Sequence, residues 1–442
     1  MPNKNQAREK IDDVPAKILK PEQQESKTKK NKLINVLNYL TDKYEFRYNL
    51  FAAKPEFRAK ISNNGFVIFN ERNFDNIFNE VKIDLGVSLP RNDLESLIGS
   101  NKLSEDYEPI KDFIFKLPKW DGKDRFTDFL KQIQLEEDEH YRPWLVRYFT
   151  RWFVAMVASL IDDYIINELA LVFVGKQGRG KTRFFNSLVP KELRLMYLYN
   201  GSFNPHDKDM KEMLGTKILI NLDEMATLTR TDIETLKSAM SERYVVLRRA
   251  YGRAPIHLYR RASFCGSHND LKFLTDQTGN RRWLPFLIHD IDVDEEFDIK
   301  LLYAQALEMW RNKSVKIWLD KQEIDDLEIY LEQFRRVPME EELVLANYRQ
   351  PDIEELATGS GVEYYQTSEL LHKLASQDEY KKMNVNDTSL NRLGKALKAL
   401  GFVKVSKRFP GLKNPKEVWA VKKIVWRDVE DIHPASGDKE LF

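Results

Sequence analysis

A continuous apolar run that stops at a loop of glycines and positive charges constrains the fold of this chain most strongly. Residues 169–185 read LALVFVGKQGRGKTRFF. Residues 169–174 have the length and the unbroken apolar character of a strand that is buried on both faces. Across residues 168–290 the pattern alternates between strand, loop and helix. We therefore expect an α/β fold in which helices cover a parallel sheet and the glycine loop follows one of its strands.

The glycine loop matches the pattern G-x-x-x-x-G-K-[ST] at residues 175–182. Its glycines allow successive backbone N–H groups to face phosphate oxygens, and the helix that follows presents its positive end to the same phosphates. Lys181 can reach the β- and γ-phosphates of ATP, and Thr182 can offer its hydroxyl to Mg²⁺. An ordinary glycine-rich connection is the alternative. We assign nucleotide binding to Gly175, Gln177, Gly178, Arg179, Gly180, Lys181, Thr182 and Arg183.

A second apolar segment supplies acidic residues that hydrolysis of a nucleotide would need. Residues 217–222, KILINL, form an expected strand that ends in Asp223 and Glu224, about forty residues after the loop. We expect Asp223 to hold Mg²⁺ together with Thr182, directly or through water. Glu224 would polarise the attacking water as a general base. A solvated turn is the alternative interpretation of this acidic pair.

Polar residues after the next strand complete the candidate catalytic set. Asn269 follows an expected strand over residues 261–267 and could contact the γ-phosphate or its water, with His268 as the lesser candidate. Arg281 and Arg282 lie in one short turn. Either could act as an arginine finger that reaches into a neighbouring subunit. A surface turn with salt bridges explains the two arginines equally well.

Two regions carry clustered positive charge that suits DNA. Residues 242–249 and 256–261 could pair as a hairpin. Guanidinium groups and an aromatic ring at its tip could bind the backbone and bases of single-stranded DNA. The alternative is that the hairpin packs on a neighbouring subunit. Residues 363–425 have the order helix, helix, two-stranded hairpin, which is typical of a winged-helix domain. We expect this domain to bind duplex DNA, and the alternative is that it contacts another protein. The DNA-binding candidates are Arg248, Arg249, Tyr251 and Arg253 in the first region, and Arg392, Lys395, Lys398, Lys407 and Arg408 in the second.

Composition limits the class of protein. The 442 residues carry a formal net charge of +1, so a surface for nucleic acid must be local. A single cysteine, Cys265, excludes an internal disulfide framework and a cysteine-based zinc cluster, and it suits the reducing cytoplasm. We find neither a signal-peptide pattern nor 18 consecutive apolar residues, so we expect no membrane partner, and we interpret residues 150–161 as a buried helix.

Shifts in composition and pattern divide the chain into six expected segments. They are a disordered basic tail (1–32), a small α+β N-terminal domain (33–130), a P-loop ATPase core (131–335), a linker (336–362), a winged-helix domain (363–425) and a C-terminal tail (426–442).

Taken together, residues 106–318 resemble the virulence-associated protein E family. The resemblance covers about half of the chain and rests on the glycine loop and on YEPI (107–110), KWDG (119–122), NLDE (221–224), YGR (251–253) and TGNRRWLP (278–285). The family comprises ATPases of phages, plasmids and genomic islands that are related to the superfamily 3 helicases and have an AAA+-like core.

The resemblance implies a ring, expected to be a hexamer, whose hairpin contacts DNA in the central channel and whose arginine acts across the subunit interface. It implies an ATP-dependent DNA helicase or replication ATPase of a mobile element, with other replication proteins as partners. Many relatives carry a primase domain, for which the residues before the core are too few, so we expect no primer synthesis. The alternatives are a DNA-binding initiator that uses ATP as an assembly switch, and a defence-related ATPase.

Overall fold

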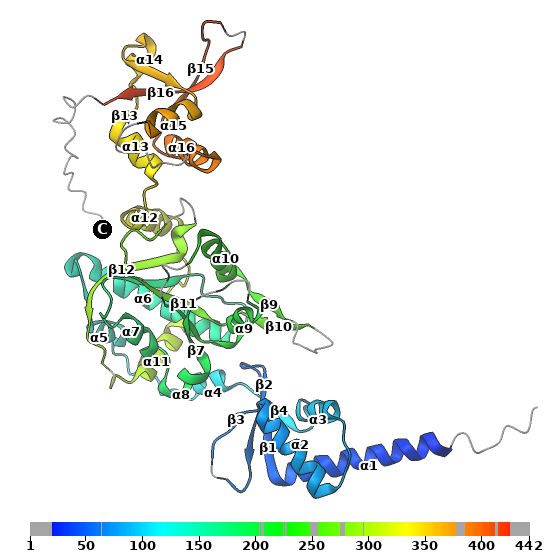
Figure 1. The fold of residues 1–442 in the computed structure, drawn as a ribbon. Helices are drawn as coiled ribbons and strands as arrows, with labels where there is room; N and C mark the ends of the chain where they lie inside the picture. The colour runs from blue at the N-terminus through cyan, green and yellow to red at the C-terminus, as the bar shows by residue number, and fades with distance from the viewer. Residues whose placement is uncertain are drawn as a thin grey trace, which may run out of the picture. The chain divides into compact units, whose positions relative to one another are not determined.

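The computed structural model describes residues 20–62, 64–202, 204, 207–223, 225, 228–247, 255–274, 279–294, 296–376, 385–411 and 414–424. These residues form two compact units (Figure 1). The first unit comprises the described parts of 1–271 and 278–331, and the second comprises those of 272–277 and 332–442. The chain has a mixed α/β architecture, as expected.

The first unit begins with a small α+β module in which helices cover one face of a sheet. Four strands pair in the order β3-β2-β1-β4, with β1 antiparallel to β2 and parallel to β4. Helices α1, α2 and α3 contribute Val36, Ile77 and Leu94 to a hydrophobic cluster that includes Phe46 of β1. The elements are α1 (Lys20–Lys43), β1 (Tyr44–Asn49), β2 (Lys54–Ala59), β3 (Val67–Ile68), α2 (Glu71–Leu85), α3 (Arg91–Ile98) and β4 (Ser104–Tyr107).

Helix α1 starts earlier than the sequence suggested. Residues 20–32 were assigned to a disordered tail, and the structure shows them as helix. Lys, Glu and Gln are good helix formers, so this polar segment extends the packed part of the helix, where Val36 and Leu40 are fully buried. The expectation of disorder is therefore wrong for residues 20–32, and residues 1–19 lie outside the described part of the chain.

A six-stranded sheet forms the centre of the first unit. Its strands have the order β5-β12-β6-β11-β8-β7, and all neighbours are parallel except the β5–β12 pair. The five residues of β6 are all buried, as expected for a strand covered on both faces. The strands are β5 (Ile133–Leu135), β6 (Ala170–Val174), β7 (Leu198–Gly201), β8 (Leu219–Leu222), β11 (Ser263–His268) and β12 (Trp283–Ile291). The parallel sheet expected from the sequence is confirmed.

Helices cover this sheet, and the longest of them is a core helix. By length and composition α6 could cross a membrane, but 72% of its most apolar stretch is buried inside the protein. Trp152 of α6 donates its indole N–H to the carbonyl oxygens of Leu169 and Phe264, both at 3.1 Å. The helices are α4 (Pro109–Phe115), α5 (Arg125–Leu130), α6 (Asp138–Ile161), α7 (Lys181–Ser187), α8 (Lys191–Tyr197), α9 (Lys208–Thr216), α10 (Arg230–Ser241), α11 (Ile299–Arg311) and α12 (Lys321–Leu331).

The N-terminal module ends before the expected boundary at residue 130. Helices α4 and α5 pack on α6 and α11, which cover the central sheet. The last strand of the N-terminal sheet, β4, ends at Tyr107. Residues 109–130 therefore belong with the central sheet, because their buried side chains, such as Phe126 and Phe129, contact aromatic residues of α6 and α7.

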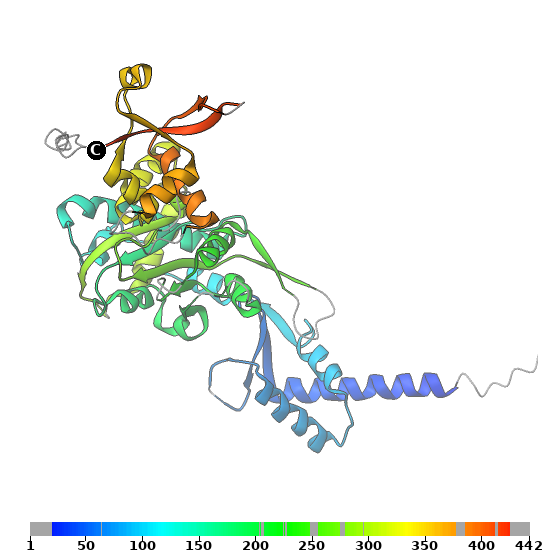
Figure 2. The ribbon, with the colours of Figure 1, turned by 45° about the horizontal axis from the view of Figure 1, so that its top comes forward.

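A separate hairpin projects from the central sheet. Strands β9 (Tyr244–Leu247) and β10 (Ile256–Tyr259) pair antiparallel and contact α9, and Figure 2 shows the hairpin projecting to one side of the central sheet. The expected hairpin is thus confirmed, with shorter strands than the sequence suggested. Residues 248–254, which hold all four basic and aromatic candidates of its tip, lie outside the described part of the chain.

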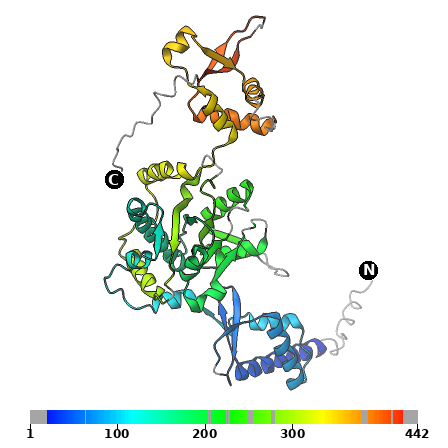
Figure 3. The same cartoon turned by 60° about the vertical axis from the view of Figure 1, so that its left-hand side comes forward.

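The second unit combines helices with a small sheet of its own (Figure 3). Strand β16 pairs antiparallel with β13, β14 and β15. Leu343, Leu370, Leu393 and Trp419 belong to the hydrophobic cluster of this unit. Its main elements are α13 (Met339–Asn347), β13 (Tyr348–Arg349), α14 (Ile353–Thr358), β14 (Val362–Tyr365), α15 (Thr367–Ala375), α16 (Asp387–Ala399), β15 (Lys404–Lys407) and β16 (Lys416–Lys423).

The segment expected to be a linker is part of this second unit. Residues 336–362 hold α13, β13 and α14 rather than an irregular connection. Leu343, Val344 and Tyr348 are almost fully buried in the cluster that also holds α15 and α16. Pro338 and Gly359 act as the N-cap and C-cap of helices here, so the residues that suggested a linker mark helix ends instead.

Candidate functional site

The glycine loop between β6 and α7 lies against the backbone of β12. Gly180 has a φ of +76°, and a Cβ atom at this position would lie 2.8 Å from the carbonyl oxygen of Ile291. A Cβ atom on Gly175 would clash with the carbonyl oxygen of Ile288. Only glycine tolerates both contacts without a shift of the backbone. Strand β12 therefore leaves no room for a side chain at positions 175 and 180 of the loop.

Lys181 occupies the interior of this loop. Its ammonium group donates to the carbonyl oxygens of Gly175 and Lys176, and it lies 3.3 Å from Oδ1 of Asn269. The residue is only 6% exposed. Burial lowers the pKa of Lys181, and the charge of Asp223 opposes this effect. An anion bound beside this buried ammonium group would stabilise its charged form.

Asp223, at the carboxyl end of β8, lies beside Thr182 in the first turn of α7. The Thr182 hydroxyl donates to Oδ1 of Asp223 at 3.3 Å, and the Ser267 hydroxyl donates to the same oxygen at 3.3 Å. Strand β11 lies between β6 and β8, so the three strand ends meet at one edge of the sheet. A hydroxyl and a carboxylate oxygen at one point are ligands that Mg²⁺ accepts alongside phosphate oxygens.

The other residues assigned to this site differ in their surroundings. Asn269 follows β11, and its side-chain oxygen lies 3.3 Å from the ammonium group of Lys181. His268, the lesser candidate, accepts the backbone N–H of Asp270 at 2.9 Å and so caps a turn. Gln177 is exposed, and Nη1 of Arg179 lies 3.7 Å from Asp290. Glu224 lies outside the described residues.

The two arginines of the TGNRRW segment differ in their surroundings. Arg282 donates from Nε and Nη2 to the hydroxyl of Ser241, at 3.3 and 2.8 Å. Arg281 is exposed on the same short 3₁₀ turn, Asn280–Arg282. The structure thus ties Arg282 to the end of α10, whereas the side chain of Arg281 faces solvent.

The basic candidates of the second unit lie in two places, on α16 and at the β15–β16 hairpin. Arg392, Lys395 and Lys398 are exposed on α16, whereas Leu393 and Leu397 are fully buried on the opposite face. At the β15–β16 hairpin Arg408 is exposed, and Lys407 lies over the ring of Tyr364 with Nζ 3.3 Å from its centroid. The structure therefore brings the α16 candidates together on one face of that helix.

Ser267 is the residue of the candidate site that the sequence did not identify. It lies in β11, two residues before Asn269, and no motif surrounds it. Its role becomes visible only through the pairing of β11 with β8, which brings its hydroxyl to Asp223.

A match to a family model agrees with this arrangement of fold and site. Residues 114–336 match the virulence-associated protein E-like domain, which is half of the chain and includes the six-stranded sheet and the glycine loop. The fold and site thus define an α/β protein with a domain of this class. The chain belongs to the virulence-associated protein E family, as its motifs had suggested.

The comparisons with solved structures and with curated proteins show weaker similarity than the family match. The apo structure of the NrS-1 C terminal region is 14% identical in sequence, with 89% of this chain and 98% of that chain covered and a TM-score of 0.44. Its A form apo structure is 13% identical, with 89% and 99% covered and a TM-score of 0.43. No curated protein is significantly similar to the chain in sequence.

Proposed function

We propose that this chain is an ATPase that acts on DNA during replication of a phage, plasmid or other mobile element. The observation that carries the proposal is the meeting of Lys181, Thr182 and Asp223 at the ends of three neighbouring strands. A cation, a hydroxyl and a carboxylate in this arrangement suit a triphosphate and its metal ion. The cytoplasm is where such a protein would meet both ATP and DNA.

The residues of the loop would bind and orient the triphosphate. The N–H groups of residues 175–180 and the N-terminus of α7 would face the phosphate oxygens, and Lys181 would exchange carbonyl partners for the β- and γ-phosphates. Thr182 and Asp223 would hold Mg²⁺, which would neutralise negative charge on the phosphates. Asn269 would orient the γ-phosphate or the attacking water, and Glu224 would accept the proton of that water.

The exposed position of Arg281 favours it as the arginine finger. A residue that stabilises charge in a neighbouring subunit has to be accessible before the subunits meet. Arg281 meets this requirement, whereas Arg282 holds Ser241 within its own subunit. We therefore assign the trans-acting role in a ring, expected to be a hexamer, to Arg281, and a positioning role to Arg282.

Two surfaces are proposed to contact DNA. The hairpin would carry Arg248, Arg249, Tyr251 and Arg253 to a single strand, and its stem already exposes Tyr244 and Tyr259. The second unit would act as a winged helix, with α16 as the recognition helix and β15–β16 as the wing. The exposed basic face of α16 supports this assignment.

Strand displacement on a forked duplex tests the proposal against its main alternative. ATP-dependent unwinding that a non-hydrolysable analogue does not support is the result expected of a helicase. ATP-promoted binding of the fork without unwinding would favour an initiator that uses ATP as an assembly switch. Absence of both binding and ATP turnover would contradict the proposal itself.

A further inference from the structure

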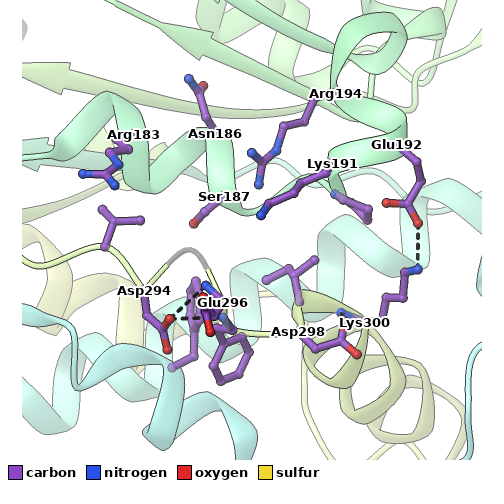
Figure 4. Close-up of a pocket in the computed structure, with 15 residues that line it drawn as sticks. Arg183, Asn186, Ser187, Lys191, Glu192, Arg194, Asp294, Glu296, Asp298 and Lys300 are labelled. Carbon is purple, nitrogen blue, oxygen red and sulfur yellow. Dashed lines mark hydrogen bonds and ion pairs between the residues drawn. The ribbon is translucent and has the colours of Figure 1, made fainter.

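The connections on the two sides of β12 belong to different units. After β12 the chain stays in the first unit, where it lines a cavity of about 560 Å³ beside α7 (Figure 4). There Lys300 of α11 forms an ion pair with Glu192 of α8 at 2.8 Å. Before β12, in contrast, residues 272–277 belong to the second unit, although they follow β11 of the central sheet. The chain therefore passes from the candidate site into the second unit before it returns to β12.

The segment that makes this passage, residues 269–274, begins at the glycine loop. The side-chain oxygen of Asn269 lies 3.3 Å from the ammonium group of Lys181. Directly before it, the carbonyl oxygen of His268 accepts the N–H of Gly175 at 3.0 Å. A ligand that moves Lys181 or the start of the loop would therefore act directly on the beginning of this segment.

The other end of the segment is fixed within the second unit by backbone hydrogen bonds. The N–H of Leu274 donates to the carbonyl oxygen of Phe334 at 3.0 Å, and the N–H of Arg336 donates to that of Leu274 at 2.8 Å. Phe273 packs edge-on against Phe334, with ring centroids 6.0 Å apart, and it is only 8% exposed. At most ~18 Å of chain separates these contacts from Asn269.

Two further contacts lead from this attachment to α16. Arg335, which lies opposite Leu274, donates to both carboxylate oxygens of Glu341 in α13, at 2.6 and 3.0 Å. Such a two-pronged pair holds its partners in one geometry, and Glu341 is only 2% exposed. Leu343 of α13 then shares a hydrophobic cluster with Leu393 of α16. The helix with the exposed basic face is therefore packed on the helix that holds the attachment.

We propose that the 269–274 segment transmits the nucleotide state of the glycine loop to the second unit, so that ATP controls how tightly α16 binds DNA. A triphosphate in the loop would offer its γ-phosphate to both Lys181 and Asn269, in place of the contact that these two residues make with each other. A ligand shifts a conformational equilibrium only through such a difference in contacts. The inference rests on the proposed nucleotide site and adds a control that this site exerts on the second unit.

Hydrogen exchange of the full chain, with and without Mg²⁺ and a non-hydrolysable ATP analogue, tests the inference without a variant. Exchange of the amides at residues 175–182 reports nucleotide binding, and exchange at Arg336, whose N–H donates to Leu274, reports the second unit. We expect the analogue to change both, by about fivefold or more at Arg336. A change at the loop alone would overturn the inference and leave the nucleotide site in place. A loop that does not respond would instead overturn the proposed function.

Phe273→Ala weakens the attachment and leaves Asn269 and the loop unaltered. The variant should bind the analogue as the unaltered chain does, but the response at Arg336 should be lost, and Phe273→Leu should restore part of it. Phe51→Ala is the matched control, because Phe51 is also 8% exposed and packs edge-on against one ring, that of Tyr197. A full response at Arg336 in the folded Phe273→Ala variant would overturn the inference.

Fluorescence anisotropy of a labelled DNA duplex tests the effect on α16. The Kd of the duplex should differ by about fivefold or more with and without the analogue, and the duplex should change the Kd of the analogue by the same factor. The difference should vanish when Arg392, Lys395 and Lys398 are all changed to Ala. Equal duplex affinity with and without the analogue would overturn the inference, as would a difference that the triple change leaves intact.

Discussion

The hydroxyl of Thr182 donates to the carboxylate of Asp223 at 3.3 Å, although 41 positions separate the two residues in the chain. Two strands and the helices between them intervene, so the contact depends on the parallel sheet. Because β11 lies between β6 and β8, their carboxyl ends come together at one edge. The candidate metal ligands are thus positioned by the fold rather than by a local turn.

Ser267 should act as a positioning residue for Asp223. Ser267→Ala removes one of the two hydroxyls that donate to Oδ1 of the carboxylate. We expect the Mg²⁺ concentration that half-saturates ATP hydrolysis to rise about tenfold, while the rate at saturating Mg²⁺ changes little. Ser159→Ala, which removes a buried hydroxyl of α6, is the control. An unchanged Mg²⁺ requirement would separate Ser267 from the metal site.

Replacing Arg281 or Arg282 with alanine should have different effects, on ATP hydrolysis and on stability respectively. Arg281→Ala should lower ATP hydrolysis by roughly 10³-fold without loss of stability. Arg282→Ala should lower the free energy of unfolding by about 1 kcal/mol, because its bonds to Ser241 are lost.

Mixing provides the decisive measurement for Arg281. Lys181→Ala subunits retain Arg281, so adding them to inactive Arg281→Ala subunits should restore turnover at the interfaces where an intact loop meets an intact arginine. A mixture as inactive as its components would rule out a trans-acting Arg281.

The exposed face of α16 should contribute sequence-independent affinity for duplex DNA. With Arg392, Lys395 and Lys398 all changed to Ala, the slope of log K against log salt concentration should fall by about 2.7 if each cation contacts one phosphate. Lys82→Ala, an exposed lysine of the N-terminal module, should leave the slope unchanged. A slope unaffected by the triple change would favour protein contact through α16.

The buried ion pair between α6 and α12 should make stability depend on pH. Burial alone would raise the pKa of Glu323, but hydrogen bonds and charge from Arg151 outweigh it and lower this pKa from 4.5 to about 2. The two hydrogen bonds between these side chains measure 2.7 and 2.8 Å. Because the pKa is lower in the folded state, the carboxylate stabilises the fold above pH 4.5, by up to about 3 kcal/mol, and this contribution is lost as the pH falls towards 2.

Urea unfolding of the unaltered chain and of Glu323→Gln at pH ~6 and ~3.5 measures this effect. The difference in unfolding free energy between the two proteins should narrow by about 1 kcal/mol at the lower pH. A difference that stays constant would show that Glu323 keeps an ordinary pKa in the folded protein.

Local patterns were sufficient for the central sheet and for most of the phosphate cradle. The apolar run over 169–174 and the glycine pattern predicted β6, the loop and α7, and parallel pairing then required Asp223 to approach Thr182. The prediction of a linker at 336–362 was wrong because Pro338 and Gly359 mark helix ends there. The burial of Leu343 depends on α16, which lies far along the chain, so local sequence could not show it. Single residues without a motif, such as Ser267, acquire a role only through tertiary pairing.

Titration of Mg²⁺ and ATP into the full chain and into Lys181→Ala tests the central claim most directly. Lys181 is the buried cation of the loop, and its ammonium group contacts two carbonyl oxygens of the loop and the side chain of Asn269. We expect the unaltered chain to bind and hydrolyse ATP, and the folded variant to lose at least ~100-fold in turnover. Equal ATP affinity and turnover in the two proteins would contradict the assignment of this loop as the nucleotide site.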